Sequence, residues 1–226
     1  MYEERPPAPW LAERVACEWH QVAETDMTQL VVPDGCVDLI WGPDGPFVAG
    51  PDTGPMPTSM RAGDTFSGIR FKPGAAGEVF GVPVHWLRDQ RVPLADLDAF
   101  PELAAEIPEE RLRAMRAAIT VRLRQTSPSD PAAPAIVAAL RSGSPVHEVA
   151  RRLGYSERQL HRRSVAGFGY SPKTLQRIVR FQRALRLARS GVPLTEVALI
   201  SGYTDQAHLS HEVRRLSGVS PRRLTA

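Results

Sequence analysis

A duplicated segment near the C-terminal end of the chain constrains its fold most strongly. Pro145–Ser156 recurs as Pro193–Thr204, and six of the twelve paired positions are identical. Gly169–Pro172 and Gly218–Pro221 then follow the two copies at nearly the same distance. Because such a repeat encodes one supersecondary unit twice, this region is expected to fold as two similar units.

The first copy has the pattern of two helices joined by a tight turn. Ser144 is expected to cap a short helix that begins at Pro145, because serine and proline favour these two positions. Gly154 is suited to the left-handed residue that ends such a helix. Ser156 and Gln159 have the spacing of a capping box at the start of a second helix.

The second copy repeats this pattern. Thr204 is expected to cap its second helix, with Asp205 at the positive end of the helix dipole. A helix, a glycine turn and a second helix form a helix-turn-helix unit, whose second helix enters the major groove of DNA. The sequence therefore predicts two such units, at residues 145–167 and 193–216.

A long helix is predicted between the two units, from Ser171 to about Arg189, with Gly191 ending it. A stiff helix would fix the separation of the two DNA-reading helices, so one chain would cover two tandem elements about 34 Å apart. Four arginines lie among its apolar positions and either contact phosphates or form a solvated face. They are Arg177, Arg180, Arg183 and Arg186.

The two halves of the chain differ in charge. Residues 1–134 hold 12 Lys and Arg and 20 Asp and Glu, whereas residues 135–226 hold 16 and 5. The basic half is expected to face a polyanion, which here is double-stranded DNA. No apolar run approaches the roughly 18 residues of a membrane span, and the first residues lack the pattern of a signal peptide. We therefore expect a cytoplasmic protein with no membrane partner.

The basic half resembles the DNA-binding module of AraC/XylS-type transcription regulators. The motifs that carry the resemblance are Val149–Ser156, Gly169–Pro172, Val197–Gln206 and Gly218–Pro221. The resemblance implies a sequence-specific bacterial regulator of transcription. If the regulator is an activator, RNA polymerase would be a further partner.

Helical spacing and the resemblance together predict the side chains that contact DNA. These are Arg158, His161, Arg162, Arg163, Gln206, Ala207, Ser210, His211, Arg214 and Arg215. In the major groove arginine pairs with guanine and glutamine with adenine, whereas Ala207 can touch only a thymine methyl group. Leu160, Leu209 and Val213 are spaced to point inward. Ser164 stands where the module usually has a large apolar residue, so we expect weaker packing of the first recognition helix.

The first hundred residues have the pattern of a β-rich domain. Four short runs are typical of strands, at residues 30–32, 37–41, 47–49 and 65–71. An amphipathic helix is predicted over Pro108–Gln125, followed by a proline-rich linker at 126–134. The predicted fold class is α+β, with a β-rich domain at 1–125 and an all-α domain of two helix-turn-helix units at 135–226.

The acidic half also resembles a little-characterised domain found before some AraC-type modules. Pro33–Trp41, Gly50–Pro51 and Gly68–Gly74 carry this resemblance. It implies a barrel-like domain for sensing a small-molecule effector or for dimerisation. The helix at 108–125 either pairs with its copy in a homodimer or packs against its own β domain.

A set of aromatic and polar residues is the candidate effector pocket. Its members are Trp19, Cys36, Trp41, Arg70 and Phe71, with Trp86 as a further aromatic residue. Arg70 would anchor a polar group of the ligand, and the aromatic rings would cover its apolar part. The alternative is that these aromatic residues form the core of the β domain.

An enzymatic, metal-binding or redox-sensing N-terminal domain is the competing class of function. Cys17, His20, Cys36 and His85 are the only candidate ligands of the two types in this half. If Cys17 and His20 share a strand, their side chains point to opposite faces. No catalytic pairing of Ser, His and Asp stands out, so we expect no enzyme, no cofactor and no metal.

Overall fold

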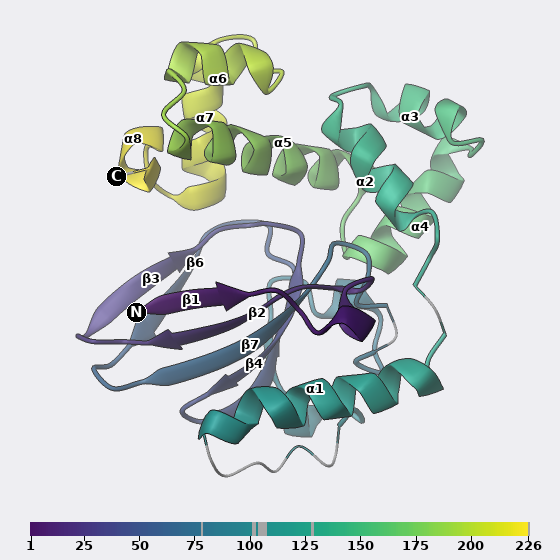
Figure 1. Ribbon diagram of the computed structural model, residues 1–226. Coiled ribbons are helices and arrows are strands. Elements are labelled where there is room, and N and C mark those ends of the chain that lie inside the picture. The colour runs from purple at the N-terminus through teal and green to yellow at the C-terminus, as the bar shows by residue number, and fades with distance from the viewer. Residues whose placement is uncertain (78, 101–102, 104–107, 128, 226) are drawn as a thin grey trace.

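The computed structural model describes residues 1–77, 79–100, 103, 108–127 and 129–225. A β-rich N-terminal part lies beneath a helical C-terminal part (Figure 1). The predicted α+β class is confirmed. No helix of these described residues is long and apolar enough to cross a membrane.

Two antiparallel sheets form the N-terminal part. The larger sheet contains, in spatial order, β1 (Tyr2–Arg5), β2 (Val15–Val22), β7 (Thr65–Phe71), β4 (Val37–Gly42), β5 (Gly45–Ala49) and β8 (Arg91–Pro93). The smaller sheet pairs β3 (Met27–Val31) with β6 (Met56–Met60). The larger sheet is open, with β1 and β8 at its edges, so the expected barrel-like domain is not a closed barrel.

The four predicted strands correspond to β3, β4, β5 and β7. The sequence patterns do not predict β1, β2, β6 and β8. Edge strands such as β1 and β8 tolerate polar residues on both faces, which removes the alternation that signals a strand. Three short 3₁₀ helices lie among the strands and are η1 (Pro9–Leu11), η2 (Val84–Trp86) and η3 (Leu94–Asp96).

Helix α1 (Pro108–Gln125) covers one face of the larger sheet, on the side away from the helical part (Figure 1). Met115 and Ile119 are fully buried in the core between this helix and the strands. Arg116 on α1 donates two hydrogen bonds to Glu18 on β2, at 2.9 and 2.6 Å. The apolar face of α1 is therefore occupied by its own domain, which is the second of the two predicted arrangements.

Seven helices form the described C-terminal part. They are α2 (Ala133–Arg141), α3 (Val146–Arg152), α4 (Glu157–Phe168), α5 (Pro172–Arg189), α6 (Leu194–Ile200), α7 (Gln206–Ser217) and α8 (Pro221–Thr225). Helix α5 joins two lobes, each of which contains one helix-turn-helix unit (Figure 1). Each lobe has its own apolar core, and Leu175 and Phe181 of α5 contribute to one core each.

Two of the predicted helix starts are off by one residue. Pro145, not Ser144, is the N-cap of α3, since its backbone is extended and the first helical residue is Val146. Asp205, not Thr204, caps α7, because the Asp205 carboxylate accepts a hydrogen bond from the backbone N–H of His208 at 2.7 Å. A carboxylate at this position also interacts favourably with the helix dipole.

The remaining cap and turn predictions are confirmed. Ser156 and Gln159 form a complete capping box at the start of α4. Ser171 caps α5 by accepting a hydrogen bond from the backbone N–H of Thr174. Gly154, at φ 73°, makes the left-handed turn between α3 and α4. These local signals set the turn before the first recognition helix, the start of that helix and the start of the long helix.

Candidate nucleic-acid interface and ligand cavity

The first recognition helix, α4, presents three predicted DNA contacts to solvent. Arg158, His161 and Arg162 are exposed, whereas Leu160 between them is fully buried. Among the described residues, none forms a hydrogen bond or ion pair with these three side chains. Their polar groups are therefore open to an external partner such as the edges of bases.

Arg163, also predicted to contact DNA, is engaged within the protein instead. Its guanidinium donates a hydrogen bond to the Asp130 carboxylate at 2.6 Å and lies 4.7 Å from the centre of the Tyr155 ring. Asp130 belongs to the segment predicted as a linker. This contact ties α4 to the chain that enters the helical part.

Ser164 departs from the usual apolar pattern for a structural reason. It is fully buried, and its hydroxyl donates a hydrogen bond to the carbonyl oxygen of Tyr170 at 2.8 Å. Phe168, one turn further along α4, is buried in the core of the same lobe. The serine therefore holds the turn after α4, while Phe168 supplies apolar volume nearby.

The second recognition helix, α7, divides its faces as the spacing predicts. Leu209, Val213 and Leu216 are buried in the core of the second lobe. The predicted DNA contacts on the other side are exposed at Gln206, Ala207, His211, Arg214 and Arg215, and half-buried at Ser210. Among the described residues, none forms a hydrogen bond or ion pair with these exposed side chains.

Two arginines of α5, Arg177 and Arg180, are half-buried and pair with a carboxylate of the protein. Arg177 donates a hydrogen bond to Glu212 of α7 at 3.0 Å, and Arg180 lies 3.9 Å from the same carboxylate. The Arg180 guanidinium also lies 4.3 Å from the centre of the Tyr203 ring. Burial opposes the ionisation of Glu212, but Arg177 and Arg180 hold the pKa of its carboxyl below the usual value.

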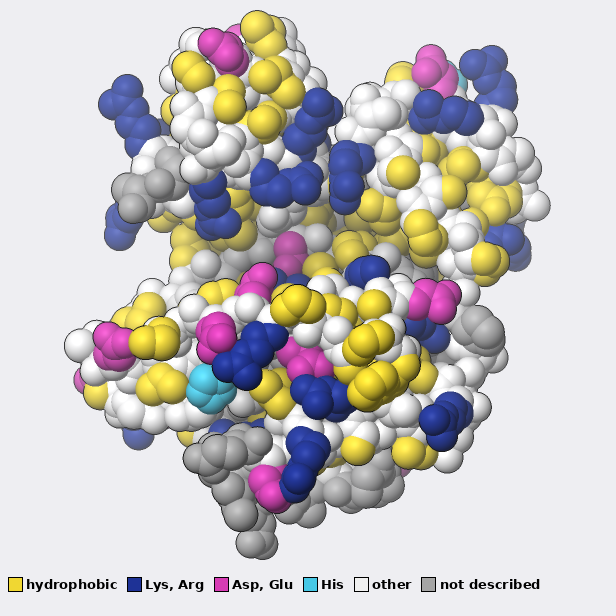
Figure 2. Space-filling view, in the orientation of Figure 1, with side chains coloured by type: hydrophobic (Ala, Val, Ile, Leu, Met, Phe, Trp, Pro, Cys, Tyr) yellow, Lys and Arg dark blue, Asp and Glu magenta, His cyan; other side chains and the backbone are white. Residues whose placement is uncertain are grey.

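Basic side chains gather over the helical part of the molecule, including the space between its two lobes, whereas acidic side chains lie mainly over the β-rich part (Figure 2). This distribution agrees with the charge difference between the two halves of the sequence. A surface with clustered arginines attracts a polyanion and orients it toward the recognition helices.

A cavity of about 1050 Å³ lies between the larger sheet, the β3–β6 ribbon and α5. Strand alternation divides the sheet residues between the cavity and the core on the other face. Ile40 and Ala49 face the cavity, whereas Leu39 and Val48 face the core beneath α1. The wall contributed by α5 contains Gln182, Leu185 and Arg189.

The predicted effector residues separate by this same alternation. Trp19, Cys36 and Arg70 line the cavity. Trp41 and Phe71 are buried in the core on the opposite face, which corrects their placement in the pocket. Trp86, 66% exposed, is not among the residues that line the cavity. Phe71 follows Arg70 directly in β7. Because successive side chains of a strand point to opposite faces, Arg70 faces the cavity and Phe71 faces the core.

Family relationships agree with this division of the molecule. Residues 149–226 match the family described as helix-turn-helix domain, and residues 3–93 match a domain of unknown function, DUF6597. Residues 149–226 form an AraC-type helix-turn-helix domain. The chain therefore carries the DNA-binding module of an AraC-type transcription regulator.

The fold is similar to that of ToxT from Vibrio cholerae. One ToxT structure has a TM-score of 0.50 at 10% sequence identity and covers 99% of this chain and 97% of ToxT. A second has a TM-score of 0.49 at 10% identity over 92% and 95% of the two chains. A third, with an unsaturated fatty acid bound, has a TM-score of 0.43 at 10% identity over 90% and 88%. No curated protein sequence matches the chain.

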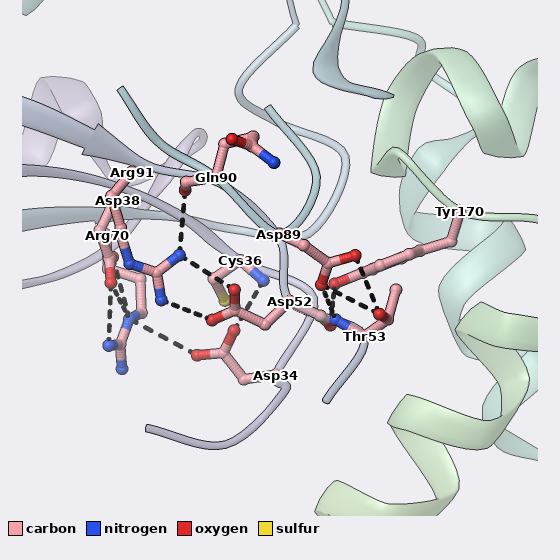
Figure 3. Close-up of polar contacts among 10 residues, drawn as sticks. All are labelled: Asp34, Cys36, Asp38, Asp52, Thr53, Arg70, Asp89, Gln90, Arg91 and Tyr170. Carbon is pink, nitrogen blue, oxygen red and sulfur yellow. Dashed lines mark hydrogen bonds and ion pairs between the residues drawn. The ribbon is translucent and has the colours of Figure 1, made fainter. Parts of the chain in front are cut away.

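A cluster of polar side chains lies in the wall of the cavity (Figure 3). Arg70 donates hydrogen bonds to both carboxylate oxygens of Asp38, each at 3.0 Å. Arg91 binds Asp52 in the same two-pronged way, at 2.9 and 2.7 Å. Asp34 accepts a hydrogen bond from the backbone N–H of Cys36 at 2.8 Å. The sequence singles out Arg70 and Cys36, but the partner carboxylates come from separate loops and strands.

Burial disfavours the ionised form of both cysteine thiols. Burial raises the pKa of the Cys17 thiol to about 11 and that of Cys36 well above its usual value. His20 forms its hydrogen bond with Ser67, at 3.1 Å. Among the described residues, no group of three or more His, Cys, Asp and Glu side chains is arranged to hold a metal ion.

Hydrogen bonds join the AraC-type domain directly to the β-rich part. The Tyr170 hydroxyl donates to the carbonyl oxygen of Asp52 at 2.6 Å (Figure 3). Gln182 of α5 donates to the carbonyl oxygen of Pro33 at 2.6 Å, and Arg88 donates to that of Gly169 at 3.2 Å. Asp52 also lines the cavity, so the cavity wall and the end of α4 share a direct contact.

Proposed function

We propose that this protein is a transcription regulator that reads two tandem DNA elements with α4 and α7. The chain would work in two parts, a sensing domain at 1–125 and a DNA-binding domain at 135–226, joined by the segment 126–134. The observation that carries the proposal is that both recognition helices expose polar side chains that have no partner in the described protein. Each of these helices buries an apolar stripe of its own in the core of its lobe. Helix α5 contributes to both cores and so joins the two recognition helices.

The chemistry of the two helices indicates how they read DNA. On α4, Arg158 and Arg162 can each bind the O6 and N7 atoms of guanine, with His161 between them. On α7, Gln206 can pair with adenine, and Ala207 can contact a thymine methyl group. Arg214 and Arg215, at the C-terminal end of α7, are placed for phosphate contacts. The site is therefore asymmetric, and a palindrome is not required.

DNA binding would respond to a small molecule in the cavity between the sheet and α5. The cavity volume of about 1050 Å³ is sufficient for a small organic ligand. One wall belongs to α5, the helix that joins the two recognition units, and the Asp52 contact reaches the residues that follow α4. If α5 can adopt two positions and the ligand binds the protein more tightly in one of them, the ligand would change the fraction of protein molecules that can bind DNA.

The test is to select genomic fragments with the purified full-length protein, followed by footprinting and salt titration. We expect two protected elements about one helical turn apart and an affinity that falls steeply as salt rises. Equal, weak binding to all fragments would contradict sequence-specific recognition by the full chain. Residues 135–226 would then be assayed alone, because recovery of specificity would locate the inhibition in the β-rich part.

A further inference from the structure

The cavity has a surplus of negative charge. Six carboxylates and four arginines are among its lining side chains. The two arginines of the polar cluster, Arg70 and Arg91, are already held by two-pronged hydrogen bonds to Asp38 and Asp52. An anionic ligand would have to displace one of these carboxylates before it could bind an arginine in the same way.

Two further carboxylates in the cavity retain unused acceptor positions. An Asp34 oxygen lies 3.6 Å from Arg70 Nε, and a Glu4 oxygen lies 3.9 Å from Arg70 Nη1. Both separations exceed hydrogen-bond length, so Arg70 attracts these groups without saturating them. The side chains of Asp34 and Glu4 are 32% and 50% exposed, which leaves them accessible from the cavity.

Aromatic rings adjoin these carboxylates. Tyr2 and Glu4 lie two residues apart on β1, so both face the cavity. The Tyr2 hydroxyl donates a hydrogen bond to Glu4 at 2.5 Å. The Tyr2 ring lies 5.9 Å from the ring of Trp19. Aromatic faces next to carboxylates favour a positively charged group through cation–π and Coulombic attraction.

Trp19 is a buried aromatic residue in the wall of the cavity. Its side chain is 7% exposed, and its Nε1 is buried with no hydrogen-bond partner among the described residues. The indole lies directly against Gly68 of β7, where a Cβ atom would come within 2.1 Å of the ring. Ile40 and Phe66 extend this surface into an apolar floor of the cavity. Because Nε1 is buried against β7, Trp19 contributes an apolar surface to the cavity and no accessible hydrogen-bond donor.

We infer that the cavity binds an amphipathic organic cation, with its ammonium or guanidinium group at Asp34 and Glu4. The apolar body of the ligand rests on the floor formed by Trp19, Ile40 and Phe66. This inference rests on the proposed function, since it names the chemical class of the effector that the regulator senses.

A matched series of three probes tests the charge of the ligand. The compounds 3-phenoxypropylamine, 3-phenoxypropan-1-ol and 3-phenoxypropionate share a ring and an ether oxygen but carry positive, zero and negative charge at pH 7. Calorimetric titration of the full chain should show the amine binding about tenfold more tightly than the other two. Equal or tighter binding of the alcohol or the propionate would overturn the inference.

Variants test the position of the charged group. Asp34→Asn keeps the acceptor for the backbone N–H of Cys36 but removes the negative charge. It should weaken binding of the amine by about fivefold to tenfold and leave the alcohol unchanged. Glu13→Gln, at an exposed residue that does not line the cavity, is the control and should leave both unchanged. Unchanged amine binding by Asp34→Asn would overturn the assignment.

The same preparation separates this inference from the proposed function. If none of the three probes binds at millimolar concentration, the organic-cation inference is wrong. Sequence-specific DNA binding by that preparation would then show that the regulator proposal still stands. Failure of specific DNA binding, with the amine bound, would instead count against the regulator and leave the cation site in place.

Discussion

At the residue scale, neighbours in the sequence have different roles because a helix or strand turns their side chains in different directions. Arg162 and Arg163 are adjacent arginines on α4, yet the first forms no hydrogen bond or ion pair with the described residues and the second binds Asp130 and Tyr155. A single net charge cannot distinguish them. Their contacts give a matched pair of substitutions with different expected results.

Arg162→Ala is expected to cost about 1–3 kcal/mol of binding free energy on the true DNA site and to relax the base preference there. Arg163→Ala should act mainly on folding, lowering the thermal midpoint through loss of its ion pair and ring contact while the base preference is retained. Binding to specific and scrambled duplexes, with thermal unfolding of both variants, measures the difference. If Arg162→Ala weakened binding to both duplexes equally, Arg162 would contact phosphate alone.

The thiols give a prediction about pH. Burial raises the pKa of Cys17 to about 11 and that of Cys36 well above its usual value, so both groups are neutral and poorly nucleophilic at neutral pH. Alkylation of Cys17 by iodoacetamide at pH 7.5 should be about a hundredfold slower than that of free cysteine, and should accelerate about tenfold per pH unit as the thiolate forms. Mass spectrometry of native and urea-unfolded protein gives both rates. Rapid labelling of the native protein at pH 7.5 would support a redox sensor.

At the element scale, both helix-turn-helix units place an arginine over a tyrosine ring and pair that arginine with a carboxylate. The two units take these charged residues from different elements. In the first unit Tyr155 is covered by Arg163 of α4, whose partner is Asp130. In the second unit Tyr203 is covered by Arg180 of α5, and the carboxylate is Glu212 of α7. The duplicated tyrosine is therefore stacked in both copies, although the arginine comes from a different helix in each.

Glu212→Gln is expected to destabilise the second unit. Arg177 Nη2 and Arg180 Nε are already buried without hydrogen-bond partners among the described residues, and the substitution would remove the charge that compensates them. The expected cost is about 1.5–3 kcal/mol in the free energy of unfolding at pH 7. Glu196→Gln, at an exposed residue of α6, is the matched control and should stay within about 0.5 kcal/mol.

The pH dependence of this contact has a defined sign. The folded pKa of Glu212 is lower than its unfolded value, so its ionised form stabilises the protein above the unfolded pKa, and this stability is lost as pH falls through the folded pKa. Denaturant unfolding at pH 7 and in the acidic range should therefore show the two proteins converging at low pH. A constant difference between wild type and Glu212→Gln at all pH values would contradict this origin.

At the scale of the whole molecule, hydrogen bonds and close packing join the DNA-binding domain to the β-rich part. The Tyr170 hydroxyl reaches Asp52, and Gly169 lies so close to the β-rich part that a Cβ atom there would come within 3.0 Å of Pro51. Because Tyr170 lies two residues after the end of α4 and Asp52 lines the cavity, this contact links the cavity wall to the first recognition helix.

Tyr170→Phe removes the hydroxyl and keeps the ring in place. We expect a loss of about 0.5–1.5 kcal/mol from the missing hydrogen bond, and a weaker response of DNA affinity to a cavity ligand. Tyr155→Phe is the control, since its ring carries the contact with Arg163. Thermal unfolding and DNA titrations with and without 3-phenoxypropylamine measure both effects. An unchanged ligand response in Tyr170→Phe would show that coupling runs through α5 instead.

Features set by local interactions could be predicted from the sequence. The capping box at Ser156, the glycine turn at Gly154 and the burial of Leu160 depend on residues within one or two helical turns, so their spacing is sufficient evidence. The same holds for α1, whose bounds agree with the predicted Pro108–Gln125. Neither short-range spacing nor composition identifies partners that lie far apart in the chain.

The sequence by itself determined the duplication, the α+β class and the exposed faces of both recognition helices, because helical periodicity and capping act over a few residues. Only the tertiary structure decided that Arg163 is bound by Asp130, that Phe71 lies in the core while Arg70 lies in the cavity, and that α5 closes that cavity. Each of these depends on which distant segments meet. Which distant segments meet is set by the packing of the whole chain. A local sequence pattern carries no information about that packing.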